Sequence, residues 1–414
     1  MKLNYKKIGD HIRLVDERNT GLKVKSLLGL SISKQFIPSV ANIIGTDMEN
    51  YKIIRKNQFA CSTMQVRRDK KMPVALLQEV DEAIISAAYP VFEIKDNKEL
   101  LPEYLMMWFS RVEFDREACF YAIGGVRGSL EWEDFCDMKL PIPKPDKQKK
   151  IVKEYNTIVN RITLNNQLIQ KLEETAQAIY KQWFVDFEFP DEEGKPYKSN
   201  GGKLDWNEEL GKEIPKGWEV KSLKSLCSKI GSGATPKGGK ESYHKTGVSL
   251  VRSMNVHDYI FSTEDLAFIN DKQAKALETV SLVKHDILLN ITGVSVARCC
   301  MVPEFVLPGR VNQHVMIIRP REEYHLSHYL LCLLCYSDSK SKLLGISQSG
   351  STREAITKME IEEFKVIKPE KLTLKSFDQK LKVLLRTIEV EIQNNIRLNE
   401  LQNLLLSKLA TLEN

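Results

Sequence analysis

The two halves of this chain share the same landmarks, and this duplication constrains the fold more than any other feature. Gly124-Gly125-Val126-Arg127 corresponds to Gly350-Ser351-Thr352-Arg353. Leu101–Leu105 and Leu326–Leu330 share a Leu-x-x-Tyr-Leu pattern. A long segment with heptad spacing follows each copy. We therefore expect the order globular unit, helix, globular unit, helix, which would present two similar surfaces to a target in two parts.

Length and composition agree with two globular domains. The chain has 414 residues, 42% of them hydrophobic, which is enough to build two cores. No run of 18 apolar residues occurs, and no apolar stretch follows the charged N-terminal residues. We therefore expect no membrane association and a cytoplasmic location.

The first unit, expected over residues 1–147, mixes short strands with loops. Alternating or β-branched runs predict strands at Ile43-Ile44, Gln65–Arg67, Val74–Leu77, Ala83–Ile85 and Val91–Ile94. Residues 102–109 are expected to form a helix, and a glycine-rich loop should follow at Gly124–Gly128. Pro141 and Pro143 favour an extended exit segment.

A long helix is predicted over residues 148–189. Its apolar residues recur in steps of four and three, and Asn165 occupies one seam position. This spacing is typical of a coiled coil, and such a helix would be roughly 55 Å long. The alternative is a helix packed against its own domain, but average globular helices are much shorter.

The remaining chain repeats this arrangement. Residues 190–211 are polar and read as a linker, and residues 212–372 form the second unit. Strands are expected at Val248–Val251, Asp286–Leu289 and Val315–Ile318, and a helix at His328–Tyr336. A second heptad segment occupies residues 373–414, and each long helix is the obvious partner for the other because neither can bury its apolar stripe alone.

The sequence predicts no catalytic residues, no metal and no cofactor. The glycine-rich segment 229–240 fails the phosphate-loop pattern because Glu241 follows Lys240. The seven histidines show no metal-ligand spacing, and the chain has no nucleophile-elbow motif. Cys332 and Cys335 have CxxC spacing within an apolar helical segment, so we expect buried thiols rather than a metal or redox site, and the same for Cys299 and Cys300.

Small-residue loops with one arginine each are the first candidates for nucleic-acid binding. Arg127 and Arg353 lie at matching places in the repeat. Glycines let backbone N–H groups approach a phosphate, and arginine offers a bidentate fork to phosphate or guanine. The alternative is a structural turn in which each arginine pairs with a neighbouring carboxylate, Glu131 or Glu354.

Other polar clusters also suit a polyanion. The net charge of +6 permits such a partner without requiring it. The candidates are the basic cluster Arg67, Arg68, Lys70 and Lys71, then Lys237, and the run Arg310, Asn312, Gln313 and His314. Asn and Gln suit adenine, and Arg suits guanine. The alternatives are an exposed hairpin tip for the first cluster and a strand with one hydrogen-bonded buried face for the last.

The whole chain resembles the specificity (S) subunits of Type I restriction–modification systems. The resemblance rests on Leu172–Phe187, on Ile214-Pro215-Lys216-Gly217-Trp218 and on Leu401–Leu412. It implies an α+β protein with two α/β target recognition domains, separated by two long antiparallel coiled-coil helices. Each domain would read one half of a bipartite, asymmetric site on double-stranded DNA. The first unit departs from the pattern because it lacks the Ile-Pro-x-Gly-Trp opening.

The resemblance also implies a non-catalytic subunit and its partners. The helices would dock two modification (adenine methyltransferase) subunits, which restriction (helicase-nuclease) subunits join for ATP-dependent cleavage. Trp183, Phe184 and Phe187 are the expected docking residues. The alternatives are a stand-alone DNA methyltransferase or nuclease with fused DNA-reading domains, and a structural coiled-coil scaffold that binds protein. Methylation or cleavage of DNA by the purified chain alone would favour the enzyme.

Overall fold

The computed structural model describes residues 5–39, 46–124, 128–236, 238–321, 325–348 and 354–411. The chain divides into two compact units. Unit 1 comprises Met1–Thr163 and Asn395–Asn414, and unit 2 comprises Leu164–Asn394. Each long helix continues from one unit into the other, so each unit contains part of both helices. The expected domain boundaries, by contrast, leave the long helices outside the globular units.

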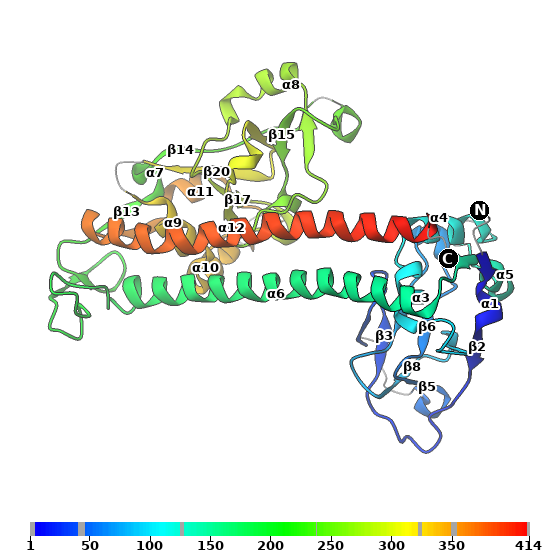
Figure 1. Cartoon of the computed structure of the whole chain (residues 1–414). Helices are drawn as coiled ribbons and strands as arrows, with labels where there is room; N and C mark the ends of the chain where they lie inside the picture. The colour runs from blue at the N-terminus through cyan, green and yellow to red at the C-terminus, as the bar shows by residue number, and fades with distance from the viewer. Residues whose placement is uncertain are drawn as a thin grey trace. The chain divides into compact units, whose positions relative to one another are not determined.

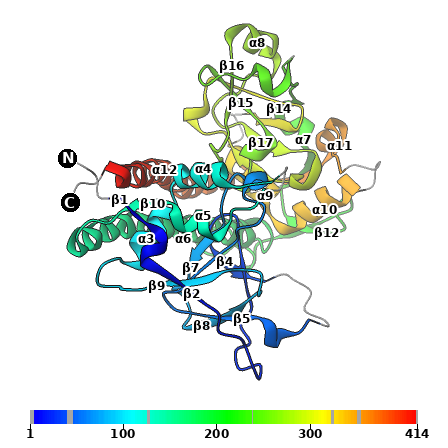
Figure 2. The same cartoon turned by 90° about the vertical axis from the view of Figure 1, so that its right-hand side faces the viewer.

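Unit 1 is built around a four-stranded sheet with the order β2-β9-β6-β7. Small pairs β1-β10, β3-β4 and β5-β8 accompany it, and Figures 1 and 2 show β5 and β8 at the end of the unit farthest from α6. Its elements are β1 Tyr5–Lys7, α1 Ile8–His11, β2 Ile12–Val15, β3 Leu28–Leu30, β4 Phe36–Pro38, η1 Met48–Asn50, β5 Lys52–Arg55, β6 Phe59–Cys61, α2 Val66–Asp69, β7 Val74–Leu76, β8 Glu82–Ile85, β9 Val91–Ile94, α3 Pro102–Phe109, α4 Val112–Tyr121, α5 Trp132–Asp137, β10 Lys139–Pro141 and the start of α6 Pro145–Phe184.

Unit 2 contains a four-stranded sheet, β14-β20-β17-β18, and a three-stranded sheet, β16-β15-β19. Its strands are β11 Leu204–Asn207, β12 Lys212–Pro215, β13 Glu219–Ser222, β14 Cys227–Ser232, β15 Val248–Val251, β16 Ala267–Ile269, β17 Ile287–Asn290, β18 Cys299–Met301, β19 Gly309–Val311, β20 Val315–Pro320 and β21 Lys365–Lys368. Its helices are α7 Leu223–Leu226, η2 Gly239–Ser242, η3 Ser253–Asn255, α8 Asp271–Ala276, η4 Glu278–Val280, η5 Gly293–Ser295, η6 Glu304–Val306, α9 Ser327–Cys335, α10 Ser337–Gln348, α11 Lys358–Glu363 and the start of α12 Lys371–Lys408, which ends in η8 Leu409–Thr411 in unit 1. Figures 1 and 2 place β15, β16 and α8 on the side of this unit away from α12.

The two units share one topology, which confirms the duplication. In unit 1 β1 pairs antiparallel with β10, and in unit 2 β13 pairs antiparallel with β21. A short helix and the first strand of the main sheet follow each opening strand, and a long helix follows each closing strand. The matched Tyr104 and Tyr329 are both buried, and their hydroxyls donate to the carbonyl oxygens of Pro141 and Ile367 at 3.0 and 2.5 Å.

The main sheet of unit 2 is buried on both faces. Ile287 and Leu289 belong to the large core that also contains α9, whereas Leu288 faces a separate core with Val315 and Ile317. Side chains alternate between faces along a strand, so a sheet covered on both sides needs continuous apolar runs. This explains why β17 and β20 were recognisable as strands in the sequence.

The long helices are antiparallel, as their contacts within each unit show. In unit 1, Tyr155 near the start of α6 accepts a hydrogen bond from Gln402 near the end of α12 at 2.9 Å. In unit 2, Phe184 at the end of α6 packs against Phe377 near the start of α12, with ring centroids 4.8 Å apart. The expected α+β fold with two long antiparallel helices is therefore confirmed.

Several predicted element boundaries were wrong. The first helix begins at Pro145, which suits the first helical turn because proline has no N–H to leave unpaired, and it ends at Phe184 rather than at residue 189. Phe187 has a φ of 60°, outside the right-handed helical region. Gln65–Arg67 is not a strand, because Gln65 has a φ of 64° and α2 begins at Val66. The Ile43-Ile44 strand lies outside the described residues.

The expected linker, residues 190–211, is more ordered than its composition indicated. The ring of Tyr197 stacks on Phe189 with centroids 4.6 Å apart. Asp191 forms backbone and side-chain hydrogen bonds with Lys195. Residues 204–207 form β11, which pairs with β12. The segment is therefore a folded connection within unit 2.

We predict that Asp286→Ala destabilises unit 2 by about 3–5 kcal/mol, because it leaves a charge without its partner inside the fold. The Asp286 side chain has no exposed surface and binds the Arg319 guanidinium through two oxygens, at 2.7 and 2.8 Å. Chemical denaturation followed by hydrogen exchange in β17 and β20 measures the loss. Lys284→Ala is the control, since its ion pair with Glu304 is exposed and should contribute less than about 1 kcal/mol. Equal effects of the two substitutions would contradict the prediction.

Candidate nucleic-acid interface

In unit 1 the structure brings two of the predicted loops together. The first is the turn that follows β6 and contains α2, where Gln65 adopts a left-handed conformation. The second ends at Gly128, whose carbonyl accepts from the Arg67 backbone N–H at 3.4 Å. A Cβ added at Gly128 would lie 3.0 Å from the Arg67 Cβ, so a glycine allows this close approach.

Arg67 and Arg68 are neighbours in sequence but differ in their partners. The Arg67 guanidinium donates to the Gly124 carbonyl at 3.2 Å and has no carboxylate partner in the described part of the chain. Arg68 instead binds Asp69 through two hydrogen bonds of 2.6 and 3.0 Å, and these raise the pKa of its guanidinium. Arg67 is therefore the better candidate for an anionic ligand. Lys70 and Lys71 are exposed beside it.

A buried ion pair lies next to this basic turn and is hydrogen-bonded to its backbone. Lys34 and Asp115 lie 2.8 Å apart, with 8% and 10% of their side chains exposed. Asp115 also accepts a hydrogen bond from the Met72 backbone N–H at 3.1 Å, directly after the basic cluster. Burial lowers the pKa of the Lys34 ammonium, and the charge of Asp115 opposes that effect. The pair therefore holds the backbone next to the exposed Lys70 and Lys71 in place.

Unit 2 repeats the same pairing of loops. Gly293 follows β17 in a left-handed conformation, as Gln65 does after β6. Its N–H donates to the Glu354 carbonyl at 3.0 Å, and Thr292 forms a bridge with Ala355. In both units, therefore, a left-handed turn after a strand of the main sheet is hydrogen-bonded to the residue that follows the matched arginine in sequence, Gly128 or Glu354.

A polar network joins this turn to the loop between β19 and β20. The Thr292 hydroxyl lies 2.7 Å from His314 Nδ1, and His314 Nε2 lies 3.1 Å from the Gln313 amide nitrogen. The Gln313 amide oxygen accepts from the hydroxyl of Thr235, which lies in the glycine-rich segment. Gln313 is exposed and Val294 is 98% exposed at the turn. Three loops thus present polar and apolar groups together.

Arg310 and Asn312 have internal roles, which agrees with the structural alternative considered for this run. Arg310 Nε donates to the Ala274 carbonyl at 3.0 Å, and its Nη1 donates to Gly309. Asn312 is 6% exposed, and its side-chain oxygen accepts from the His314 N–H at 3.0 Å. Of the four predicted readers in the run, Gln313 is exposed, Arg310 and His314 are half-buried, and Asn312 is buried.

Three predicted residues, Arg127, Lys237 and Arg353, lie outside the described residues. Gly128, Glu354 and Thr235 flank them in the chain and are described, and each forms a hydrogen bond within the two sites. Sequence reasoning missed Thr235, Thr292 and Val294 in unit 2. Gly293 was the only signal for that turn, and Gln65 gave none, because a left-handed glutamine resembles any other glutamine in a sequence.

Trp183, Phe184 and Phe187 are core residues, so they do not offer the open docking surface expected of them. Their exposed fractions are 4%, 3% and 5%. Phe184 packs on Trp218 and Tyr329, and Trp183 packs on Phe377. The same residues that resembled the family motif therefore fasten the long helices into unit 2.

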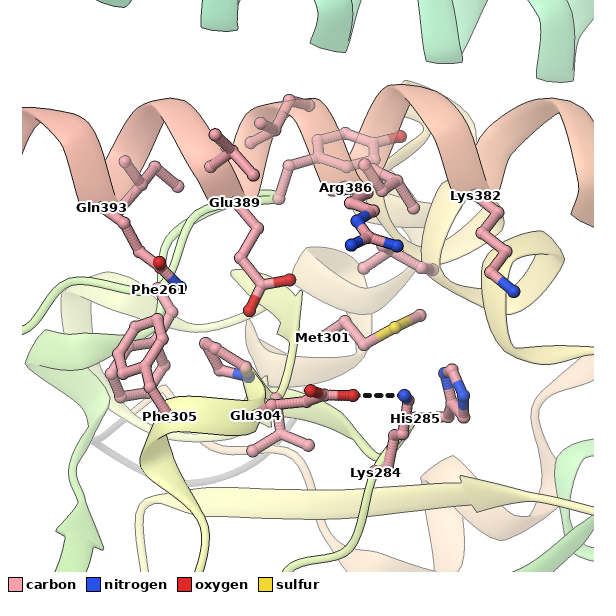
Figure 3. A pocket seen from close by; sticks show the side chains of 18 of the residues that line it. Phe261, Lys284, His285, Met301, Glu304, Phe305, Lys382, Arg386, Glu389 and Gln393 are labelled. Atoms are coloured by element: carbon pink, nitrogen blue, oxygen red, sulfur yellow. Dashed lines mark ion pairs between the residues drawn. The ribbon is translucent and has the colours of Figure 1, made fainter.

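Unit 2 also contains a cavity of about 720 Å³ beside α12. Figure 3 shows Lys382, Arg386, Glu389 and Gln393 extending from α12 toward a wall formed by residues such as Glu304 and Phe305. The dashed line marks the ion pair between Lys284 and Glu304. The residues that line the cavity carry charges of both signs, so the cavity shows no preference for a nucleic acid.

A family model, described as the Type I restriction modification DNA specificity domain, matches residues 41–174 and 215–400. The Type I restriction enzyme HindI specificity subunit of Haemophilus influenzae is 22% identical over 89% of this chain and 89% of its own length. The MjaIX specificity subunit of Methanocaldococcus jannaschii is 26% identical over 75% of this chain and 68% of its own.

A solved structure has the same fold. The S subunit of a Type I restriction–modification system from M. genitalium superposes with a TM-score of 0.57 and 14% identity, over 100% of this chain and 99% of that one. No helix in the described part of the chain is long and apolar enough to cross a membrane.

Proposed function

The chain belongs to the Type I restriction–modification DNA specificity family, and from this premise we propose that it reads a bipartite DNA site with one half for each unit. The observation that carries the proposal is the matching pair of loops in the two units, to which unit 2 adds the loop between β19 and β20. The site in unit 1 presents arginine and lysine, whereas the site in unit 2 presents glutamine, histidine and valine. Because these side chains differ, the two half-sites would differ in sequence, and the target would be asymmetric.

Between them, the two sites contain groups for both kinds of DNA contact. Exposed Arg67, Lys70 and Lys71 suit phosphates, which position a protein without selecting a sequence. Gln313 offers an amide that can contact adenine, and the exposed Val294 side chain can contact a thymine methyl group. The net charge of +6 assists association with a polyanion but adds no selectivity.

The proposal includes no catalytic role for this chain. Methylation would come from two modification subunits, and cleavage from restriction subunits that join them. The runner-up, a stand-alone methyltransferase or nuclease, requires reacting groups of its own. The two sites described above consist of basic, amide, imidazole and apolar groups, which suit recognition.

We predict that Arg67→Ala weakens specific DNA binding by about 1–3 kcal/mol, because the exposed guanidinium is available for a phosphate or a base. Arg68→Ala is the matched control, and its effect should stay below about 1 kcal/mol because Asp69 already pairs with that charge. Binding is measured at one fixed salt concentration, with the chain assembled with its modification subunits.

The same assembly tests the division into half-sites. Mapping methylated adenines should show that Arg67→Ala relaxes or weakens only one half of the motif, while Gln313→Ala affects only the other. An undivided recognition sequence, or equal loss in both halves from either substitution, would refute the assignment of one half to each unit. Methylation by the chain without any partner would instead support the enzyme alternative.

The docking surface is assigned to exposed apolar residues on the long helices, in place of the buried aromatic residues. In unit 2, Val383 and Val390 are 66% and 46% exposed and lie seven residues apart on α12, so they share one face. In unit 1, Leu401 and Leu404 on the same helix are 52% and 51% exposed. Apolar side chains that remain uncovered on a helix are suited to a partner protein.

We predict that Val383→Glu reduces affinity for the modification subunit at least tenfold, since a charge replaces an apolar side chain whose burial is worth about 1.5–3 kcal/mol. Met359→Glu on α11 is the control, because Met359 is 63% exposed but lies outside the long helices. Co-purification and calorimetric titration measure the effect. Wild-type affinity in Val383→Glu, with Met359→Glu also unchanged, would move the docking surface elsewhere.

The long helices should set the spacer between the half-sites. We predict that a matched insertion of seven residues, after Thr163 and after Asn394, lengthens the preferred spacer. One heptad adds about 10 Å to each helix, equivalent to about 3 base pairs, and keeps the seam in phase. Methylation mapping should find both half-site sequences unchanged but binding weaker, because the second unit is also rotated. An unchanged spacer at full affinity would show that the helices do not set the distance.

A further inference from the structure

Two cysteine sulfur atoms lie unusually close together at the edge of the main sheet of unit 2. Cys299 Sγ in β18 lies 3.2 Å from Cys335 Sγ, which is at the end of α9. Cys299 is fully buried, and Cys335 is partly exposed. Cys335 belongs to the CxxC spacing, and Cys299 is one of the two cysteines that are adjacent in sequence. The sequence did not indicate that these two residues would be in contact.

A carboxylate completes the cluster. Asp258, Cys299 and Cys335 each have a ligand atom within 4.8 Å of the others. Asp258 Oδ1 accepts from the Cys299 backbone N–H at 3.2 Å, and Oδ2 forms an ion pair with Lys340. The next residue, Tyr259, donates its N–H to the Cys299 carbonyl at 3.0 Å. The turn and the strand are thus tied together at the cluster.

A second carboxylate faces the same region without a partner. Glu173 Oε1 on α6 is buried and accepts no hydrogen bond from the described residues. Burial raises the pKa of Glu173 to about 7, and the charge of Asp258 adds to the effect. One turn later on the same helix, Gln177 donates to the Tyr259 hydroxyl, which places this side of α6 next to the Asp258 turn. Lys340 is the single cation that pairs with Asp258 within the described residues.

We propose that Asp258, Cys299 and Cys335 form a binding site for a thiophilic divalent cation such as Zn²⁺. Two thiolates and a carboxylate are a donor set that zinc prefers, and a water molecule or Glu173 would supply the fourth position. Binding releases the two thiol protons to solvent, and no electron transfer is required. The ion would join β18, α9 and the Asp258 turn, and so strengthen the recognition fold of unit 2.

The sulfur separation favours a metal site over a disulfide. Two thiolates at about 2.3 Å from one tetrahedral Zn²⁺ lie about 3.7 Å apart, whereas a disulfide requires about 2.05 Å. From 3.2 Å, the sulfurs would separate by about 0.5 Å to bind zinc, but would approach by more than about 1 Å to form a bond. A disulfide would also need an external oxidant.

Cobalt titration of the full, reduced chain tests the site, because Co²⁺ bound to thiolates gives charge-transfer absorption that carboxylate ligands do not give. One Co²⁺ per chain, displaced by Zn²⁺, is expected. Cys299→Ser and Cys335→Ser should weaken binding more than tenfold and reduce that absorption. Asp258→Asn should weaken binding while the absorption of bound Co²⁺ persists.

Cys300→Ser is the matched control. Cys300 is next to Cys299 and equally buried, but it packs in the other core of unit 2, so its variant should bind like the wild type. Native mass spectrometry and the rise in melting temperature with Zn²⁺ give readouts independent of colour. No thiolate absorption in the wild-type chain, or a Cys299–Cys335 disulfide that forms in place of metal binding, would overturn the proposal. Equal loss in Cys300→Ser would reassign the effect to core packing.

Discussion

The burial of the apolar stripes of α6 and α12 is the constraint on which the rest of the structure depends. Neither helix can exist alone in water with such a stripe exposed. Each helix therefore contributes residues to the cores of both units. Phe184 and Phe377 belong to the core of unit 2, and Ile151 and Leu406 to that of unit 1. Because the helices are components of the cores, the recognition units cannot rotate freely about their own helix segments.

The sequence predicted the long-range organisation well because that organisation depends on periodicity. Heptad spacing identified both helices, and continuous apolar runs identified β17 and β20. The matched Tyr104 and Tyr329 were among the landmarks of the repeat, and the structure shows why tyrosine is suited to both positions, since each hydroxyl satisfies a buried carbonyl. These features follow from burial and local spacing, which a single sequence records directly.

The candidate sites were less predictable because they depend on contacts between distant loops. The sequence did not show that Arg68 pairs with Asp69 or that Arg310 binds backbone carbonyls within unit 2. Conversely, Thr292 is part of the site because it contacts His314, and the only sequence signal for its turn was the neighbouring Gly293, which has a left-handed conformation. The aromatic residues at the end of α6 were also misread, because a family motif marks a residue as constrained without saying whether packing or docking is the cause.

The pairing of opening and closing strands has a consequence for how such a chain can change. In unit 2, β13 and β21 lie side by side, so the chain between them leaves and returns at one place. The equivalent pair in unit 1 is β1 and β10. The segment between the two paired strands therefore begins and ends at adjacent points in either unit, and the paired strands and long helices lie outside it. Exchange of this segment for another one between the same two strands would change the side chains of one site and leave the paired strands and long helices unchanged. New binding preferences could then arise by recombination of whole segments rather than by gradual substitution.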